Sequence, residues 1–303
     1  MSSLIEQAAK RLEQLRNAGI DVPAGAGDAA AVLAGHPGDA VPALAEPAVP
    51  APSSRRVDID MGLLEANGIV TPTAPRSRIA DEYRVIKRPL ISNAMSRGAA
   101  ALQHGNLIMV TSALAGEGKS FTALNLAMSI AAELDHTVML VDADVARPSV
   151  LRMLGLPDSA GLLDLLEGKA DMAEVLLRTN VDKLTVLPSG TPHPRATELL
   201  ASEAMRLLLD DISKRYPDRI VIFDSPPLNL TTEARVLAAQ MGQIILVVQA
   251  DRTLQADVQH ALSTVEACPV KMMLLNRVRP DRHGSYGYGY GYGYGYGHES
   301  HAA

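Results

Sequence analysis

Six short runs of aliphatic residues recur along the chain and constrain its fold more than any other feature. The runs span 106–112, 137–143, 183–188, 219–224, 243–249 and 270–276. They are almost continuously apolar, as strands are when both faces of their sheet are covered, and stretches with helical spacing separate them. Because parallel strands need helical crossovers between them, the alternation predicts a doubly wound, mainly parallel α/β domain over about residues 76–280.

The composition indicates one large domain with an aliphatic core. The 303 residues include no Trp and two Phe, whereas hydrophobic residues make up 47%. The net charge of −6 disfavours a nucleic-acid partner, because nucleic-acid-binding domains usually carry a basic surface. Cys268 is the single cysteine, which excludes an intramolecular disulfide and agrees with a reducing cytoplasm. The apolar runs are all shorter than the ~18 residues that a membrane span requires.

Three segments fall outside the predicted domain. Residues 1–20 place Leu4, Leu12 and Leu15 on one side of an amphipathic helix. Residues 21–75 are predicted to be a linker, since Ala, Pro and Gly dominate them up to about Ser54. Residues 281–303 form a tyrosine-rich tail. At the start of the domain we expect a charged helix over 78–89, ending at Pro89.

A phosphate-binding loop follows the first apolar run. Residues 113–120 are ALAGEGKS, and a helical stretch comes directly after them. This sequence fits the P-loop pattern with Ala113 in place of the first glycine. Gly116 and Gly118 let backbone N–H groups turn toward phosphate oxygens, Lys119 neutralises the β- and γ-phosphates, and the Ser120 hydroxyl is a ligand for Mg²⁺. The predicted ligands are therefore ATP and Mg²⁺, contacted by Ala115, Gly116, Glu117, Gly118, Lys119, Ser120 and Phe121.

Acidic residues end two further runs. Asp142 and Asp144 follow the second run, and Asp224 ends the fourth. At a strand end the first two share a face, so both can approach the γ-phosphate, one as a base and one near the metal. Helix capping ahead of Pro148 is the alternative role for this pair. Asp224 is expected to hold the waters of Mg²⁺, which makes the predicted metal site Ser120, Asp142 and Asp224.

Two more polar residues complete the predicted site. Arg147 is a candidate for stabilising the charge of the transferred phosphoryl group, with a plain surface arginine as the alternative. Asn276 ends the last run, and its carboxamide offers the donor and acceptor that an adenine edge requires. The predicted catalytic residues are Lys119, Asp142, Asp144 and Arg147.

The tail alternates tyrosine with glycine. Residues 285–298 are SYGYGYGYGYGYGH, so that six phenols are displayed by Tyr286, Tyr288, Tyr290, Tyr292, Tyr294 and Tyr296. Glycine at every second position increases the entropy lost on ordering and leaves little to pack, so we expect a solvated segment. By itself such a tract favours a low-complexity linker. On the same chain as a P-loop, it favours a set of phosphate acceptors.

Together, ALAGEGKS, VDADVARP, IVIFDSPP and the terminal tyrosine cluster resemble the bacterial tyrosine kinases of capsule and exopolysaccharide synthesis, and most of all the soluble exosortase-associated tyrosine autokinases. The resemblance implies MgATP-dependent phosphorylation of the tail between subunits of a ring-like homo-oligomer. It also implies activation by a membrane chain-length regulator, a polysaccharide co-polymerase adaptor, and hence a cytoplasmic location peripheral to the inner membrane. It places the family's P-loop lysine and hydroxyl on Lys119 and Ser120, and its aspartates on Asp142, Asp144 and Asp224.

Three departures from the family's pattern and one difference from its relatives bear on this interpretation. Ala113 stands where a P-loop glycine is common, and Ala146 stands where arginine is frequent, which leaves Arg147 as the nearby guanidinium. The oligomerisation helix usually carries Glu and then Arg three and six residues on, whereas this chain has Asp81, Arg84 and Lys87, and lysine does not reproduce the bidentate fork of arginine. Partitioning-type ATPases carry an extra lysine early in the P-loop, where this chain has Leu114 and Ala115. A partitioning-type ATPase that cycles on and off a membrane partner is thus the disfavoured alternative, and a scaffold that binds ATP only to assemble is another.

Overall fold

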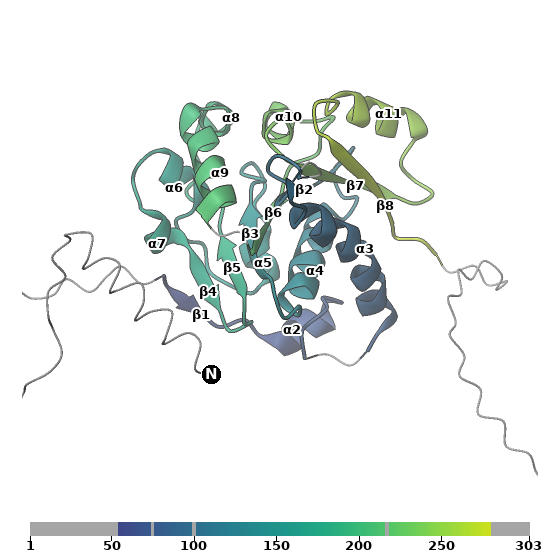
Figure 1. Cartoon of the computed structure of the whole chain (residues 1–303), viewed down its shortest axis with the longest axis horizontal. Coiled ribbons are helices and arrows are strands. Elements are labelled where there is room, and N and C mark those ends of the chain that lie inside the picture. Colours follow the sequence, from purple (N-terminus) through teal and green to yellow (C-terminus); the bar gives the residue numbers. More distant parts are fainter. Residues whose placement is uncertain (1–53, 74–75, 99–100, 216–217, 280–303) are drawn as a thin grey trace, which may run out of the picture. The chain divides into compact units, whose positions relative to one another are not determined.

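The described part of the chain is an eight-stranded sheet with helices on both faces (Figure 1), which confirms the predicted doubly wound fold. This computed structural model describes residues 54–73, 76–98, 101–215 and 218–279. The predicted N-terminal helix, most of the predicted linker and the tyrosine-rich tail lie outside these ranges. Within them, no helix is long and apolar enough to cross a membrane.

All six predicted apolar runs form strands, and two short strands join them at one edge. The strands are β1 (Arg56–Val57), β2 (Leu107–Ser112), β3 (Thr137–Asp142), β4 (Leu177–Thr179), β5 (Leu184–Leu187), β6 (Arg219–Asp224), β7 (Gln243–Gln249) and β8 (Val270–Asn276). The helices are α2 (Met61–Ala66), α3 (Arg78–Ala94), α4 (Lys119–Ala131), α5 (Val150–Met153), α6 (Leu162–Leu166), α7 (Met172–Val175), α8 (Ala196–Leu200), α9 (Glu203–Arg215), α10 (Thr232–Ala238) and α11 (Gln255–Ser263).

The order of the strands brings the predicted site residues to one edge of the sheet. The order is β1-β4-β5-β3-β6-β2-β7-β8, and every neighbouring pair is parallel except β4 and β5. The central strand β6 lies between β3 and β2, so the carboxyl ends of these three strands are side by side. Asp142 pairs in register with Asp224 across β3 and β6. Ligands of open α/β sheets bind at such carboxyl ends.

Two apolar clusters, one on each face of the sheet, hold the helices in place. Alternate residues of a strand point to opposite faces. In β2, Leu107 and Met109 belong to the cluster with α6, α8, α9 and α10, whereas Ile108 and Val110 belong to the cluster with α3 and α4. The central strands are buried along nearly their whole length, which explains their continuous apolar sequence.

The helix predicted to end at Pro89 continues to Ala94, so that prediction was wrong. Proline lacks the N–H that would bond to the carbonyl four residues earlier, at Val85. Val85 is 73% exposed, so water can satisfy that carbonyl on the solvent side of α3. The buried side of the helix, with Tyr83 and Leu90, continues packing on both sides of the proline.

Residues 54–73 pack on the domain, although they fall within the predicted linker. Ile59, Leu64 and Ile69 are each at most 3% exposed and join the cluster around α4. The side chain of Asn125 in α4 accepts a hydrogen bond from the backbone N–H of Val70 at 2.8 Å. The domain therefore begins before residue 76, because three apolar residues beyond the Ala- and Pro-rich stretch suffice to anchor this segment.

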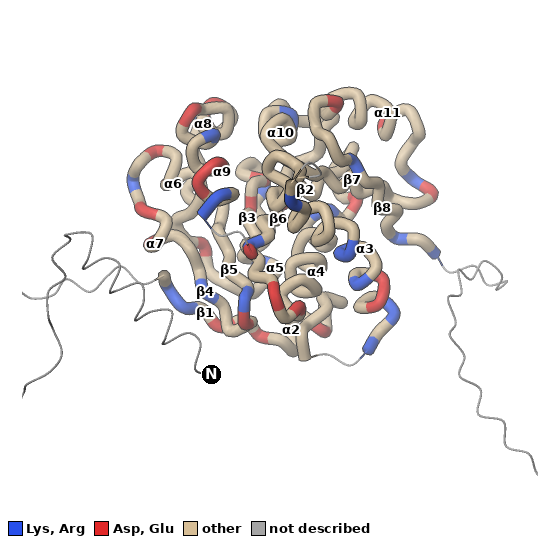
Figure 2. Tube along the Cα trace, viewed as in Figure 1, with Lys and Arg blue, Asp and Glu red and all other residues tan. Residues whose placement is uncertain are grey.

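Charged residues of both signs are interspersed along the described chain (Figure 2), and Lys87 is the one buried lysine or arginine among the described residues. Its ammonium lies 2.7 Å from the Glu133 carboxylate and donates to the carbonyl of Ser129 at 2.5 Å. Asp81 and Arg84, on the same helix, are exposed and pair with each other. Of the three residues at the positions of the resembled family's oligomerisation motif, Lys87 thus makes its ion pair and hydrogen bond inside its own subunit.

We expect Glu133→Gln to lower the free energy of unfolding by about 3 kcal/mol, because it leaves the Lys87 ammonium buried without an anion. Chemical denaturation of the full chain measures this change. Glu82→Gln is the matched control, since it removes a 2.8 Å ion pair to Arg78 in which both side chains are more than half exposed. Such an exposed pair contributes less than about 1 kcal/mol. Equal effects of the two substitutions would contradict the buried-pair interpretation.

Candidate active site

The loop between β2 and α4 has the backbone of a phosphate-binding cradle. Gly116 and Gly118 have φ values of 83° and 99°, a region that residues with a side chain rarely adopt. A Cβ on Gly118 would lie 2.1 Å from the Nδ2 atom of Asn276, so space as well as conformation requires glycine there. Helix α4 begins at Lys119 and points its first N–H groups into the loop.

The buried side chain of Glu117 stabilises this loop through hydrogen bonds within the protein. Its side chain is 2% exposed, and its Oε2 atom accepts from the backbone N–H of Leu114 at 2.6 Å. Its Oε1 atom accepts from the N–H of Gln249 at 3.3 Å and from the hydroxyl of Thr253. The carboxylate predicted among the nucleotide contacts therefore faces the protein and joins the P-loop to the end of β7.

Asn276 is the second residue that fastens the P-loop. Its Nδ2 atom donates to the carbonyl of Glu117 at 2.8 Å, and its Oδ1 atom accepts from the N–H of Arg277 at 2.9 Å. Both polar ends of the carboxamide are engaged within the chain. The predicted pairing with adenine stays a prediction, and the contact with the P-loop is a role that the sequence did not indicate.

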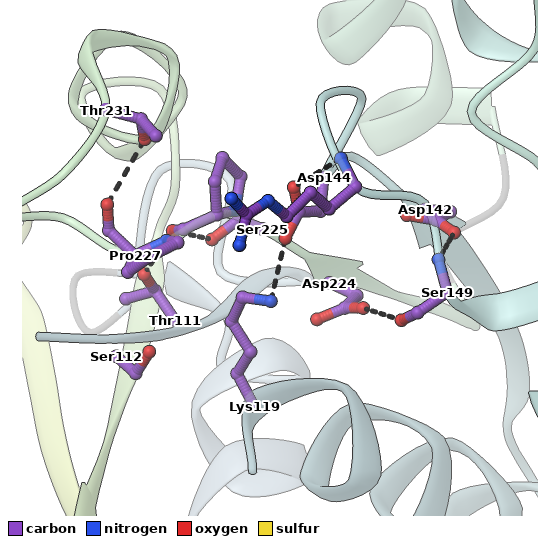
Figure 3. Close-up of polar contacts among 12 residues, drawn as sticks. Thr111, Ser112, Lys119, Asp142, Asp144, Ser149, Asp224, Ser225, Pro227 and Thr231 are labelled. Carbon is purple, nitrogen blue, oxygen red and sulfur yellow. Dashed lines mark hydrogen bonds and ion pairs between the residues drawn. The ribbon is translucent and has the colours of Figure 1, made fainter. Parts of the chain in front are cut away.

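Lys119 and Asp144 form an ion pair at the centre of the site (Figure 3), with Nζ and Oδ2 2.7 Å apart. Their side chains are 14% and 5% exposed. Asp144 also accepts from the backbone N–H of Arg147 at 3.2 Å. Of the two aspartates that were predicted to approach the γ-phosphate, Asp144 thus already has a cationic partner, and Lys119 must exchange it for phosphate oxygens when a nucleotide binds.

Asp142 and Asp224 each keep one oxygen available. The Oδ2 atom of Asp142 accepts from the backbone N–H groups of Ser149 and Val150, both at 2.9 Å. The Oδ1 atoms of Asp142 and Asp224 are buried and have no hydrogen-bond partner among the described residues. We call these two atoms the open oxygens. In Figure 3, Asp224 lies between Lys119 and the Asp142–Ser149 pair, and Asp142 and Asp224 are paired in register on neighbouring strands, so the two carboxyl groups belong to one site.

Burial raises the pKa values of both carboxyl groups. For Asp142 it raises the pKa to about 6, against the lowering effect of the backbone N–H groups of Val150 and Ser149. For Asp224 it raises the pKa to about 7, although the nearby Lys119 ammonium favours the charged form. Neighbouring negative charges add to the rise in each case. A bound cation or a hydrogen-bond donor would stabilise the charged form of each of these two carboxyl groups and so lower its pKa.

We expect the metal-free protein to become more stable as the pH falls from about 7 to about 4. Asp142 and Asp224 take up protons at higher pH in the folded chain than in the unfolded chain, so over this interval the folded state binds more protons. The gain from Asp142 is on the order of 2 kcal/mol. Chemical denaturation in EDTA at several pH values measures it. Asp224→Asn should flatten the slope, and an unchanged slope would contradict this assignment.

A cavity of about 470 Å³ opens beside the P-loop and fits a polyphosphate. Lys119, Ser120, Asp144 and Arg147 line it, together with Arg152. Arg147 and Arg152 are exposed and bring two positive charges to its rim. The sequence did not indicate Arg152 as a site residue, because nothing in it showed that α5 returns to the P-loop. The ring of Phe121, in contrast, packs with the apolar cluster beside α4, so a phosphate contact from Phe121 would be made by its backbone N–H.

The donor set also fits Mg²⁺ bound together with phosphates. Over the described ranges, no three His, Cys, Asp or Glu side chains are grouped to hold a metal by themselves. Mg²⁺ is usually held by one or two protein oxygens, with phosphates and water completing its shell. Ser120 lines the phosphate cavity beside Lys119, and the open oxygen of Asp224 has no hydrogen-bond partner among the described residues. Lys119, Ser120, Asp142, Asp144 and Asp224 are therefore brought together as predicted.

Sequence comparisons relate the chain to nucleotide-dependent enzymes. The model of the ParA family described as the NUBPL iron-transfer P-loop NTPase matches residues 103–275. The tyrosine-protein kinase YwqD of Bacillus subtilis (strain 168) is 31% identical over 72% of this chain and 90% of its own length. The tyrosine-protein kinase CpsD of Streptococcus agalactiae is 32% identical over 61% of this chain and 82% of its own.

Solved structures show the same relation. The chimeric protein CapA2B2 is 27% identical with a TM-score of 0.60, and the match covers 75% of this chain and 95% of that one. The kinase domain of the Escherichia coli tyrosine kinase ETK is 25% identical with a TM-score of 0.56, over 76% of this chain and 97% of that one. These similarities extend over the sheet and the P-loop site together.

Proposed function

The chain belongs to the ParA-type P-loop NTPases and, among them, to the bacterial tyrosine-protein kinases, and from that premise we propose that it transfers the γ-phosphoryl group of ATP to its own tail tyrosines. The observation that carries the proposal is the open oxygen of Asp142, a buried proton acceptor beside the P-loop on a chain that also holds six clustered tyrosines. The relatives named above are kinases, which favours this activity over the partitioning-type ATPase.

Different residues of the site have different roles in the proposed phosphoryl transfer. The N–H groups of the P-loop and the Lys119 ammonium hold the phosphates, and Arg147 offers its charge at the rim. Ser120 and Asp224 would hold Mg²⁺, with Asp142 as a further candidate ligand. When bound, Mg²⁺ supplies charge neutralisation to the β- and γ-phosphates. These groups position the donor and stabilise its charge, which is the larger part of catalysis in this class of reaction.

Asp142 is the proposed base. A phenol has a pKa of about 10, so at neutral pH it arrives protonated. The open oxygen of Asp142 accepts this proton while the phenolic oxygen forms a bond to the γ-phosphorus. The bond between the γ-phosphorus and the bridging oxygen breaks, and ADP leaves with the electron pair. Asp144 is less suited to this role because its Oδ2 atom is paired with Lys119.

The exopolysaccharide setting and the partners are also part of the proposal. The family resemblance supports regulation of polysaccharide polymerisation or export, a homo-oligomer in which one subunit phosphorylates the next, and a membrane co-polymerase adaptor that activates the kinase. The exposed Asp81–Arg84 pair on α3 is a candidate for contact between subunits. A cytoplasmic protein held at the inner membrane by this adaptor follows from the same reasoning.

Labelling with [γ-³²P]ATP tests the proposed activity. The full chain should incorporate label on Tyr286 to Tyr296, and mass spectrometry should map the phosphate to these residues. A chain without residues 285–297 should hydrolyse ATP and incorporate little label. Hydrolysis of ATP without labelling of tyrosine in the full chain would favour the ATPase, and binding of ATP without hydrolysis or labelling would favour the scaffold.

Phosphorylation of the tail should also change the oligomer. Each phosphate adds a charge of about −1.5 to −2, so six add about −9 to −12. The whole unmodified chain carries −6. We expect neighbouring tails to repel one another and the assembly to open as labelling proceeds. Native mass spectrometry before and after incubation with ATP measures this change, and an assembly that persists at full phosphorylation would contradict it.

A further inference from the structure

Strand β8 is an open edge of the sheet. It is the last strand in the order and pairs only with β7 among the described residues (Figure 1). The carbonyl of Asn276 accepts from the N–H of Ala250 at 2.9 Å, on the side of β7. Backbone groups alternate in direction along a strand, so the N–H and C=O groups of Lys271, Met273 and Leu275 point away from β7. No described strand lies on that side to bond with them.

The open edge also carries exposed apolar side chains. Met273 and Leu275 are 65% and 61% exposed. Met273 is in register with Leu246 of β7, which is buried in the cluster that includes Ala261 of α11. The cover that α11 gives to this face of the sheet therefore ends at β7. An exposed, apolar edge strand is a template on which a further segment can pair.

The one charged residue of β8 does not protect this edge. Edge strands are often protected by lysine, whose charge disfavours an added strand. The ammonium of Lys271 instead donates to the carbonyl of Glu266 at 3.1 Å and to that of Cys268 at 2.6 Å. It is thus held at the start of the strand, and the edge beside Met273 and Leu275 stays open to an uncharged segment.

We propose that segment 285–297 of the same chain pairs with this edge as an antiparallel strand, with its tyrosines beside Met273 and Leu275. Side chains of a strand alternate between its faces, so the Tyr-Gly repeat puts every tyrosine on one face. Aromatic residues opposite aliphatic ones are favourable cross-strand pairs. The segment carries no charged side chain, so its docking brings no charge onto the apolar edge. Such pairing needs neither ATP nor kinase activity.

The connection from β8 to this segment suits a reversal of the chain. Residues 277–284 separate Asn276 from Ser285, and they include Pro280 and Gly284, residue types that favour turns. A segment that returns along the strand before it is antiparallel to that strand and needs only a loop between them. The short connection also gives the segment a high effective concentration at the edge.

The docked segment would lead away from the phosphate cavity. β8 ends beside the P-loop, since Asn276 donates to the carbonyl of Glu117 at 2.8 Å. A returning strand runs from that end toward the start of β8. A tyrosine opposite Lys271 would then lie about 17 Å along the strand from Asn276. Docking thus holds tyrosines apart from the phosphoryl donor of their own subunit and gives the tail a resting position.

Hydrogen exchange of the full chain without nucleotide, resolved to single residues, tests the pairing. Because a shift by two residues restores the same contacts, all the tail tyrosines must be replaced together. Proline removes the N–H that each tyrosine would donate to the edge. We expect the N–H groups of Met273 and Leu275 to exchange about threefold or more faster in this variant. The N–H groups of Met272 and Leu274 bond to β7 and should exchange at an unchanged rate. The substitutions are Tyr286→Pro, Tyr288→Pro, Tyr290→Pro, Tyr292→Pro, Tyr294→Pro and Tyr296→Pro.

Tyrosine→leucine substitution at the same positions is the matched control, because it keeps each N–H and an apolar side chain. The leucine variant should retain the slow exchange of Met273 and Leu275. Equal exchange of these two N–H groups in the unsubstituted chain and the proline variant would overturn the proposal. Since no ATP is present, this result is separate from the test of kinase activity, and either can fail while the other stands.

A photo-crosslinking phenylalanine derivative at Met273 identifies the occupant of the edge. Mixed oligomers of full chains with light and heavy nitrogen distinguish crosslinks within one chain from crosslinks between chains. Crosslinks to residues 285–297 of the same chain support the pairing. Crosslinks mainly between chains, either to the tail or to β8 of a second copy, overturn it.

Discussion

Lys119→Met should lower the rate of tyrosine labelling by about 10³-fold or more, since it removes the cation that meets the β- and γ-phosphates. Lys119 is the P-loop side chain with a formal charge inside the phosphate cavity, and its ammonium now lies 2.7 Å from Asp144. Methionine keeps the apolar stem but offers no donor. Initial rates of ³²P transfer, with phosphosite mapping by mass spectrometry, measure the loss.

Two controls accompany Lys119→Met. Lys169→Met makes the same change at a lysine whose side chain is 60% exposed, and the labelling rate should then be unchanged. Chemical denaturation shows whether Lys119→Met remains folded, because the substitution also leaves the buried Asp144 without its cation. A folded Lys119→Met protein that labels its tail at the normal rate would exclude the P-loop as the phosphoryl donor site.

Asp142→Asn should lower the labelling rate by about 10²–10⁴-fold, the usual contribution of a general base. The hydrogen bonds around Asp142 make this substitution a clean test. The amide oxygen of asparagine can still accept from the N–H groups of Ser149 and Val150. The NH₂ group then takes the place of the open oxygen, where it donates instead of accepting. Single-turnover labelling at saturating ATP measures the step itself.

The comparison of Asp142→Asn with Asp144→Asn assigns the base. Asp144→Asn removes the partner of Lys119 and should change nucleotide affinity more than the rate of a single turnover. Asp182→Asn, at an exposed residue after β4, is the matched control and should have no effect. Normal single-turnover labelling in Asp142→Asn together with loss in Asp144→Asn would transfer the role of base to Asp144.

The sequence predicted the central sheet because buried parallel strands have an unmistakable composition. It did not predict β1 and β4, which are two and three residues long, since strands so short leave no periodic pattern. It ended α3 at Pro89 because proline usually breaks a helix. The free-energy cost of a proline inside a helix depends on whether the carbonyl that loses its hydrogen bond faces water. The exposure of Val85 shows that it does, and this exposure is known only from the structure.

The same division holds for the site. Lys119, Asp142 and Asp224 could be placed together from the sequence, because parallel strands end at one edge. The hydrogen-bond and ion-pair partners of the individual side chains could not be predicted from the sequence. Which aspartate pairs with Lys119, and that Asn276 bonds to the carbonyl of Glu117, depend on positions of loops to within about an ångström, and hydrogen bonds require that precision.

The hydrogen bond from Asn276 to the carbonyl of Glu117 fixes the chain to the P-loop at residue 276, and this anchor limits how far the tail tyrosines can lie from the site. Tyr286 follows Asn276 by 10 residues and Tyr296 follows it by 20. At about 3.3–3.6 Å per residue, these tyrosines can lie at most about 36 Å and 72 Å from that anchor. Acceptors tethered at such lengths have effective concentrations that reach millimolar values when the span matches. Within an assembled oligomer, the supply of tyrosine to any site within that radius is then set by the length of chain between anchor and acceptor, and dilution changes it only by separating the subunits.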